Sequence, residues 1–197
     1  METAILKPFI RYDLDILFVG LNPAIVSNHK GHYFSVKQSF WTQLYEAGLI
    51  TSRVDKDAAD EIIFGDTKFN LNNFDYGITD LVTNIAESDS SNVKPTLYDC
   101  RNLEQIIREY RPKVVIILHN KVKKMFVTRF LKKGKLKSNY GNIGRLLNDC
   151  ETIFYNIPFP HNNNIKDEEK IRLYREVKNY ITKTNLSVSA IIDGRKK

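Results

Sequence analysis

The chain has 197 residues, with 30 Lys or Arg against 23 Asp or Glu, so its formal net charge is +7. This length fits one domain with a sizeable core, and 42% hydrophobic residues is ordinary for a globular protein. Two cysteines, Cys100 and Cys150, exclude a disulfide framework and a four-cysteine metal or iron–sulfur site, and no apolar run approaches the ~20 residues that span a bilayer.

Apolar runs bounded by glycine predict the elements of the first half of the chain. Residues 15–20, Asp-Ile-Leu-Phe-Val-Gly, predict a buried strand followed by a loop over residues 21–38. Helices are expected over residues 39–47 and 55–64, each followed by a glycine that can end it. A weak strand is expected over residues 77–82.

The next segment gives the clearest signals. Apolar residues at three- and four-residue steps predict an amphipathic helix over residues 96–110, which Pro112 ends. Residues 113–118, Lys-Val-Val-Ile-Ile-Leu, predict a buried strand. A helix over residues 121–131 and a basic loop over residues 132–142 follow.

The last predicted elements complete an alternating pattern. A strand is expected over residues 151–155 and a helix over residues 166–181. Apolar strands that alternate with helices are typical of a parallel sheet covered on both faces. We therefore predict a three-layer α/β/α sandwich with a mostly parallel sheet of about four strands. It forms one domain over residues 1–181, and residues 182–197 form a polar tail expected to be flexible.

The loop after the first strand is chemically rich. Ligands of such sheets bind outside the carboxyl ends of the strands. Gly20 allows a sharp turn, and Asn22 presents an amide that Pro23 holds in place. An aromatic cluster, His-Tyr-Phe, follows at residues 32–34. An amide beside aromatic rings suits a planar heteroaromatic ligand, and the alternative is a turn with a capping Asn and core aromatics.

The motifs in this loop resemble a known family. Gly-Leu-Asn-Pro at 20–23, Gly-His-Tyr-Phe at 31–34, Phe-Trp at 40–41 and Ala-Gly-Leu at 47–49 resemble the first motif block of the mismatch-specific uracil/thymine DNA glycosylases. That family belongs to the uracil-DNA glycosylase superfamily, whose fold is an α/β/α domain. Segments 76–82, 112–118 and 157–164 are similar to its later blocks. The resemblance extends from about Asp15 to Tyr180.

The resemblance implies a monofunctional DNA glycosylase of base excision repair, without strand-cleaving (lyase) activity. It would hydrolyse the N-glycosidic bond of uracil, or of another deaminated or mismatched base, after the base is flipped out of the DNA. Asn22 would position the attacking water, and Phe34 would stack on the base. An amide is not a general base, so the enzyme is expected to be slower than relatives that use a carboxylate. The residues implied to contact the base are Leu21, Ser27, Tyr33, Phe34 and Phe159.

His161 has two interpretations. It could donate a hydrogen bond to the leaving base and so be catalytic, or it could be a turn residue packed on Pro158 and Pro160. The remaining histidines show no metal-ligand spacing. No metal and no cofactor are therefore predicted.

Charge is concentrated in one segment. Residues 110–148 contain eleven Lys or Arg and no acidic residue, a pattern that favours an acidic partner such as nucleic acid. We expect this segment to contact phosphate if it folds onto the same edge as Asn22. The residues expected to contact DNA are Lys30, Lys132, Lys133, Lys135, Asn162, Asn163 and Asn164.

Four positions depart from the family pattern. Ala24 replaces a glycine, and Phe159 stands where the family has a base-contacting Asn. Asn163 stands where an intercalating Leu is usual, and a polar amide is a poorer wedge. Asp80 occupies a position where relatives place a basic residue near DNA. These departures leave the preferred base open.

Two alternatives remain at this stage. The first is a non-catalytic member of the same fold that binds DNA or senses damage, which the altered segment 157–164 favours. The second is an unrelated α/β domain that binds a small nucleotide, which the absence of a phosphate-binding glycine motif disfavours. The expected partner is DNA, double-stranded with a damaged or mismatched base, with single strands as a further substrate. The protein is expected to be an intracellular monomer, cytoplasmic in a prokaryote or nuclear in a eukaryote, with no membrane contact.

Overall fold

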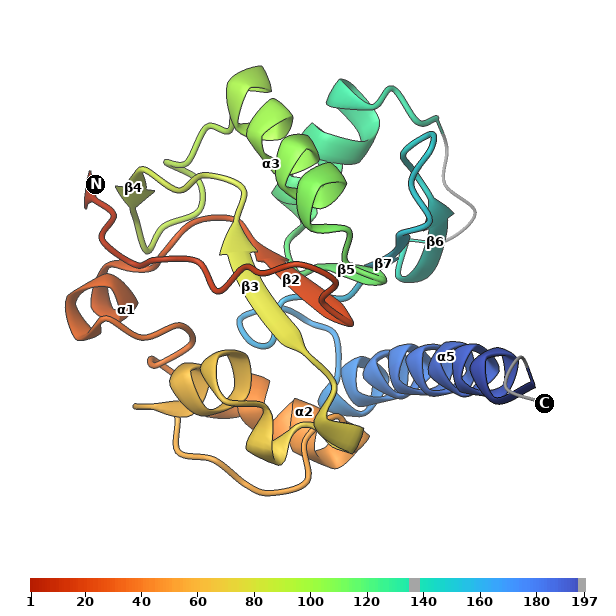
Figure 1. Cartoon of the computed structure of the whole chain (residues 1–197). Coiled ribbons are helices and arrows are strands. Elements are labelled where there is room, and N and C mark those ends of the chain that lie inside the picture. The colour runs from red at the N-terminus through yellow and green to blue at the C-terminus, as the bar shows by residue number, and fades with distance from the viewer. Residues whose placement is uncertain (135–138, 195–197) are drawn as a thin grey trace.

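A five-stranded sheet forms the centre of the molecule. The computed structural model describes residues 1–134 and 139–194, with side chains described up to residue 185. The strand order is β3-β2-β5-β7-β6, with bounds Tyr76–Asp80, Ile16–Gly20, Val114–Ile117, Ile153–Asn156 and Gly141–Arg145 (Figure 1). The first four strands are parallel, and β6 is antiparallel to β7. The mostly parallel sheet is thus confirmed, with five strands instead of about four.

Helices of three kinds connect these strands. The α-helices are α1 Ile25–Lys30, α2 Ser39–Ala47, α3 Leu97–Tyr110, α4 Asn120–Val122 and α5 Asp167–Gly194. The π- and 3-10 helices are η1 Glu61–Gly65, η2 Thr67–Phe69, η3 Leu71–Asn73 and η4 Lys123–Phe130. A separate two-stranded sheet joins β1 Glu2–Thr3 to β4 Ile85–Ala86. No helix among the described residues is long and apolar enough to cross a membrane.

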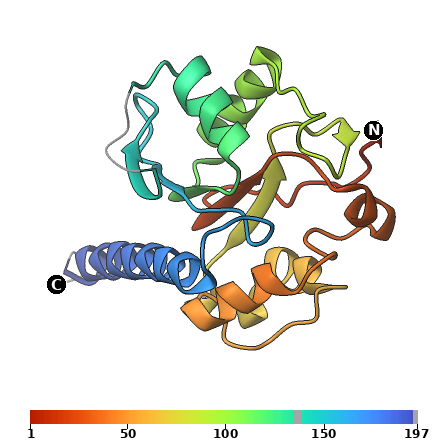
Figure 2. The same cartoon turned by 180° about the vertical axis from the view of Figure 1, so that it is seen from behind.

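The sheet is the middle of three layers. Successive side chains of a strand point to opposite faces, and β2 shows this directly. Ile16 and Phe18 belong to a core cluster that includes residues of α2, α5 and η1. Leu17 and Val19 belong to a second cluster with residues of α3 and η4. Figure 2 shows these helix groups on the two sides of the sheet, which confirms the predicted α/β/α sandwich.

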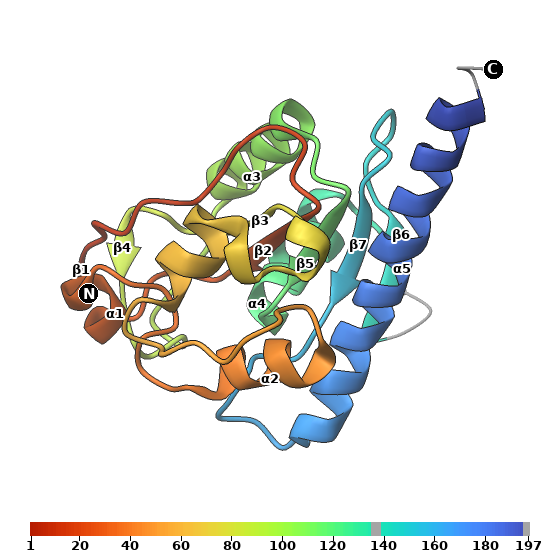
Figure 3. The ribbon, with the colours of Figure 1, turned by 60° about the horizontal axis from the view of Figure 1, so that its bottom comes forward.

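Helices α2 and α5 pack against each other on one face of the sheet. Figure 3 shows α2 beside the first turns of α5, where the rings of Phe40 and Tyr174 meet with centroids 6.5 Å apart. Gly48 ends α2 in the left-handed region at φ +73, as its predicted role requires. At the other face, Thr96 and Asp99 form a capping box that starts α3.

Four expected boundaries were wrong. The loop expected over 21–38 contains the short helix α1, which was not predicted because it has no side-chain cap. The helix expected from residue 55 begins at residue 59 and ends in the π-helical η1. The loop expected over 132–142 overlaps the start of β6. This strand was not predicted because its two glycines have a low strand propensity. The last helix continues past Ile181 to Gly194, so residues 182–194 of the expected tail are helical.

The four parallel strands all end at one edge of the sheet. Gly20 pairs with Asp80 at the ends of β2 and β3, and Ile117 pairs with Asn156 at the ends of β5 and β7. The loops that follow these residues therefore meet at a single place, although they come from distant parts of the sequence.

Candidate active site

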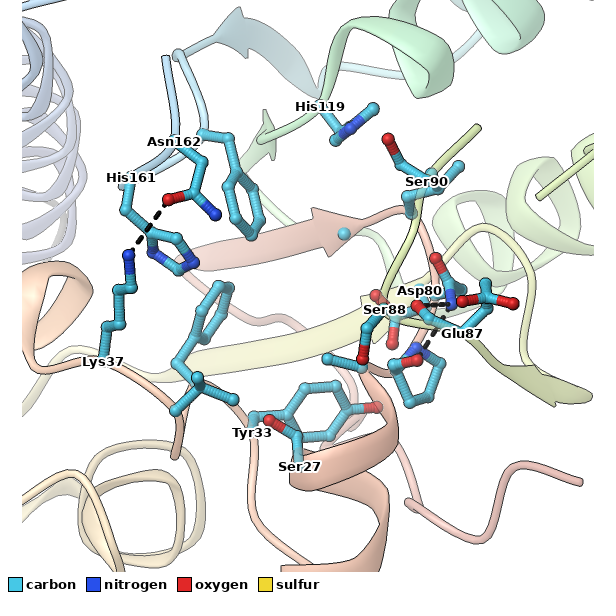
Figure 4. Close-up of a pocket in the computed structure, with 18 of the residues that line it drawn as sticks. Ser27, Tyr33, Lys37, Asp80, Glu87, Ser88, Ser90, His119, His161 and Asn162 are labelled. Atoms are coloured by element: carbon cyan, nitrogen blue, oxygen red, sulfur yellow. Dashed lines mark hydrogen bonds between the residues drawn. The ribbon is translucent and has the colours of Figure 1, made fainter. Parts of the chain in front are cut away.

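A cavity of about 500 Å³ lies at this carboxyl edge. Its walls come from residues 20–27 and 33–37, from the segments around residues 80, 88 and 119, and from the loop over residues 158–163 (Figure 4). The cavity brings together residues that the sequence analysis singled out in the first and the last of these loops. The lining residues that were predicted are Leu21, Asn22, Ser27, Tyr33, Phe34, Phe159, His161, Asn162 and Asn163.

The side chain of Asn22 is held in one orientation. Its Nδ2 donates hydrogen bonds of 2.9 Å to the backbone carbonyls of Pro23 and Glu87. The Glu87 amide also donates to the Pro23 carbonyl at 2.9 Å, which ties the two segments together. Both amide protons are thus used, and Oδ1 remains as an acceptor. A half-buried acceptor fixed at the rim of a cavity can hold a water molecule by one of its protons.

One carboxylate fixes the aromatic segment of the first loop. Asp60 accepts hydrogen bonds from the Tyr33 amide at 2.7 Å and from His32 Nδ1 at 2.9 Å. Gly31 ends α1 with φ +76, and Phe34 takes the left-handed region at φ +51. A phenylalanine at positive φ is uncommon and costs backbone energy. The fold therefore imposes a strained backbone to turn this ring toward the cavity.

Aromatic rings form one wall of the cavity. Phe34 stacks on Phe40, with centroids 3.9 Å apart and an interplanar angle of 23°. The Phe159 ring lies 6.2 Å from Phe34 and 4.8 Å from the ring of His161. Such a wall suits a flat heteroaromatic ring. The Phe159 side chain gives this wall an apolar surface where an amide was expected from the resemblance.

A buried cation holds the loop that carries His161. Lys170 is 2% exposed, and its Nζ donates to the Pro160 carbonyl at 3.0 Å and to Asp167 Oδ1 at 3.1 Å. Gln43 Nε2 donates to the same two acceptors at 2.9 Å and 3.0 Å. The loop is therefore anchored to α2 and α5 through one carbonyl.

Asn163 serves the same loop. Its Nδ2 donates to the carbonyls of Phe159 and His161 at 2.6 Å and 3.1 Å, and its Oδ1 accepts from the Ile165 amide at 3.0 Å. All three bonds are local to the turn. The exposed Asn163 side chain is thus committed to loop structure.

His161 lies half-buried beside the aromatic wall. Burial lowers its pKa, and the positive charges of Lys37 and Lys170 lower it further. Its Nδ1 is 3.4 Å from the Ser39 hydroxyl. When that hydroxyl donates, the proton of the neutral ring is on Nε2. His161 thus lines the cavity with an imidazole whose lowered pKa favours the neutral form near pH 7.

A second histidine at the cavity was not predicted as a site residue. His119 follows β5, and its Nδ1 accepts a hydrogen bond of 3.0 Å from the Lys121 amide as the N-cap of α4. Its neutral ring therefore carries the proton on Nε2. Burial lowers the pKa of His119, with a smaller contribution from Lys121. A polar residue directly after a buried strand is the sequence signal that could have indicated it.

Asp80 is the buried acid of the cavity. It ends β3, is 6% exposed and lines the cavity near Ser88 and Glu87 (Figure 4). Burial raises its pKa to about 7. The resemblance places a basic residue near DNA at this position. In this structure the position holds an acid, and its carboxyl lies inside the cavity.

Several predicted DNA contacts lie elsewhere. Lys30 pairs with Asp57 at 2.7 Å on the surface, and Lys132, Lys133 and Asn164 do not line the cavity. Lys135 lies outside the described residues. The roles of these residues on DNA stay predictions.

The basic segment over residues 110–148 does not form one face at the cavity edge. Lys113 pairs with Asp15 at 2.8 Å before β5 and β2 begin. Arg145 pairs with Glu151 and lies opposite Ile153, at the start of β7. Both lie at the amino edge of the parallel strands, away from Gly20. Lys121, nearer the cavity, donates to the backbone carbonyls of Ser90, Ser91 and Val93. Lys113 and Arg145 therefore do not meet the condition for phosphate contact, which was a position at the same edge as Asn22.

Residues 1–134 and 139–194 contain no cluster of side chains suited to bind a metal ion. No group of three or more His, Cys, Asp or Glu side chains there could hold a metal ion. Cys100 is buried and Cys150 is half-buried, and neither forms a disulfide.

Comparison with known proteins identifies the family of the chain. The family model described as the uracil DNA glycosylase superfamily matches residues 8–181, which include all five strands of the central sheet. The match is to the superfamily and does not distinguish the mismatch-specific family within it. A comparison with curated proteins found no match.

Proposed function

The chain belongs to the uracil DNA glycosylase superfamily, and we propose that it is a monofunctional DNA glycosylase that removes uracil or another deaminated or mismatched base from DNA. Members of the superfamily are hydrolases that act on DNA. The observation that carries the proposal is the fixed amide of Asn22 at the rim of a cavity with an aromatic wall.

Asn22 would hold the attacking water. Because Nδ2 is bonded to the carbonyls of Pro23 and Glu87, Oδ1 can accept one proton of a water molecule without reorienting. Such placement lowers the activation barrier, because the entropy cost of bringing the water to the sugar and aligning it is already met on binding. The water would then attack the anomeric carbon of the sugar as the glycosidic bond breaks.

The flipped base would lie against the ring of Phe34. Stacking of a base on an aromatic side chain contributes about 1–3 kcal/mol and tolerates different bases. The imidazoles of His161 and His119 line the same cavity, and a neutral imidazole carries one N–H group. Such donors stabilise negative charge that develops on the leaving base.

The amines near the cavity support hydrolysis without lyase chemistry. Lys37 is the lysine among the described lining residues, and its Nζ donates to Asn162 Oδ1 at 3.0 Å. Figure 4 shows Lys37 across the cavity from Asp80 and from Glu87, whose carbonyl accepts a hydrogen bond from Asn22. An amine so placed is poorly positioned to attack the anomeric carbon. Lys37 instead suits contact with a DNA phosphate.

The test is base release from labelled duplexes. Duplexes carrying uracil, hypoxanthine, xanthine or mismatched thymine, and the matching single strands, are incubated with the protein and then cleaved with alkali at abasic sites. Wild type should release at least one of these bases, and Asn22→Ala should lose release while it retains DNA binding. The control is Asn148→Ala, an exposed amide at the far edge of the sheet. Full activity of Asn22→Ala would reject the assignment.

A non-catalytic role in DNA binding is the second candidate. The ring of Phe159 in the wall where an amide was expected favours it. This role predicts salt-sensitive binding to DNA with no abasic product on any duplex. The same base-release assay separates the two candidates.

A further inference from the structure

The carboxyl group of Asp80 occupies space that only a glycine leaves free. Gly20 and Asp80 are partners at the ends of β2 and β3. A β-carbon built on Gly20 would lie 2.1 Å from Asp80 Oδ1, far inside contact distance. The absence of a side chain at residue 20 therefore allows this carboxyl to lie across the end of β2, two residues before Asn22.

This carboxyl is buried without a partner. Asp80 is 6% exposed, and Oδ2 is fully buried with no hydrogen bond. No hydrogen bond or ion pair of the carboxyl is found among the described residues. Burial of a polar group without a partner costs free energy, and native proteins rarely tolerate it. In a residue that lines the cavity, this cost indicates a group that meets its partner only when substrate and water are bound.

The water held by Asn22 needs such a group. Asn22 Oδ1 can accept one water proton, but an amide cannot take that proton away. As the oxygen bonds to carbon, its proton must pass to a base. Asp80 ends the strand adjacent to the one that leads into Asn22, and it is the buried carboxyl among the described lining residues.

We propose that Asp80 is the general base of the hydrolysis, an inference that rests on the glycosylase function proposed above. The Asp80 carboxylate takes one proton from the water that Asn22 holds. The water oxygen forms a bond to the anomeric carbon, and the carbon–nitrogen bond breaks with its electron pair leaving on the base. The base departs as an anion and takes a proton from solvent, while the carboxylic acid returns its proton to solvent.

The pKa of Asp80 and those of its neighbours in the cavity suit the role of a general base. Burial raises the pKa of Asp80 to about 7, close to the value that is most effective for a base at neutral pH. The other titratable lining groups are Tyr33, Lys37, Glu87, His119, Tyr140 and His161. Burial raises the pKa of Tyr33 far above neutral, hydrogen bonding from the Asp89 backbone lowers that of Glu87, and burial lowers those of both histidines. A rise in rate centred near pH 7 therefore reports Asp80.

The experiment is a single-turnover pH profile on the duplex, among those of the panel above, whose base wild type releases fastest. The wild-type rate should rise about tenfold per pH unit and level off near pH 7. Asp80→Asn keeps the shape of the side chain but cannot accept a proton. It should lower the rate by about 10²–10⁴-fold, the usual contribution of a general base, and should remove the inflection. Asp149→Asn, the same change on an exposed acid, should retain both.

A second variant guards against a folding defect. Asp80→Ala leaves a space for a small acid, so added formate should restore part of its rate, whereas formate should not rescue Asn22→Ala. An Asp80→Asn variant with the wild-type rate and inflection, or an Asp80→Ala variant that formate does not rescue, would overturn the inference and leave the glycosylase function standing. A wild-type protein that releases no base from any duplex would overturn both.

Discussion

Lys170 Nζ donates a hydrogen bond of 3.0 Å to the carbonyl of Pro160, from a position 2% exposed to solvent. The same ammonium group contacts Asp167 at 3.1 Å, and Gln43 reinforces both contacts. A cation this deeply buried needs bonded partners to offset its desolvation. One of these partners, the Pro160 carbonyl, belongs to the loop that carries His161, so the packing of α2 against α5 determines where an imidazole enters the cavity.

We expect Lys170→Met to loosen this loop. The substitution keeps the length of the side chain but removes its donors, and a buried carbonyl that loses a partner costs about 1–3 kcal/mol. The melting temperature should fall, and the KM for DNA should rise more than kcat falls. Arg172→Met is the control on the same helix, because its ion pairs with Glu169 and Glu176 are exposed and contribute little to stability. Equal effects of both variants would contradict the role of Lys170.

Phe34→Leu should weaken engagement of the base. The change keeps an apolar side chain against Phe40 but removes the flat ring that faces the cavity. A lost base–aromatic stack costs about 1–3 kcal/mol, which is roughly a 5- to 150-fold fall in kcat/KM. Tyr98→Leu removes an exposed ring on α3 and should leave kcat/KM unchanged. A Phe34→Leu variant with wild-type kinetics would place the base elsewhere.

Phe159→Asn should change the choice of base. The resemblance places a base-contacting amide at this position, and the present ring offers no hydrogen bond. An added hydrogen bond contributes about 0.5–1.5 kcal/mol, or roughly 2- to 10-fold in kcat/KM for a base with a matching edge. The base-release panel measures this as a changed ratio between uracil and hypoxanthine. An unchanged ratio would show that residue 159 does not contact the base.

The ionisation of Asp80 should make stability fall as pH rises. Its pKa is about 7 in the folded protein against an ordinary value of 3.8, so the protonated folded form is favoured. The stabilisation is complete below about pH 4, is lost as pH rises through 7, and amounts to roughly 1.4 kcal/mol per pKa unit at most. Urea unfolding at pH 5 and pH 8 should show a smaller difference for Asp80→Asn than for wild type or Asp149→Asn. Parallel profiles for all three would contradict the burial of this charge.

Contacts to phosphate should be seen in the salt dependence of DNA binding. Lys37 lines the cavity, so Lys37→Gln should reduce the slope of log binding constant against log salt by about 1. The same measurement on Lys132→Gln and Lys133→Gln tests the predicted contacts beyond the cavity. Arg145→Gln, at the amino edge of the sheet, should not alter the slope. A reduced slope for Arg145→Gln would place the DNA across a different face.

The sequence predicted the strands and the long helices because their signals are local. The apolar run over residues 15–20 and the glycine after α2 each specify their element without tertiary help. β6 could not be found this way, because Gly141 and Gly144 adopt positive φ and the strand exists only through its pairing with β7. Helix α1 was also missed, because no side chain caps its start and the sequence therefore carries no local signal for it.

The site was partly predictable for the same physical reason. Asn22 and His161 could be placed together, since the carboxyl ends of parallel strands share one edge. The position of His119 after a buried strand could have indicated it, but the burial of Asp80 and the hydrogen bond from the Lys121 amide to His119 could not be predicted. Those properties arise only when the strands are aligned in their final register.

The close approach of Gly20 and Asp80 also constrains the order in which this lineage can change. A side chain at residue 20 would displace the carboxyl of Asp80 from its present position, because the two would occupy the same volume. A smaller residue at position 80 leaves Gly20 undisturbed. The two positions are thus expected to covary among descendants of this sequence, and laboratory evolution should accept substitutions at residue 20 more readily in lineages that first replace Asp80.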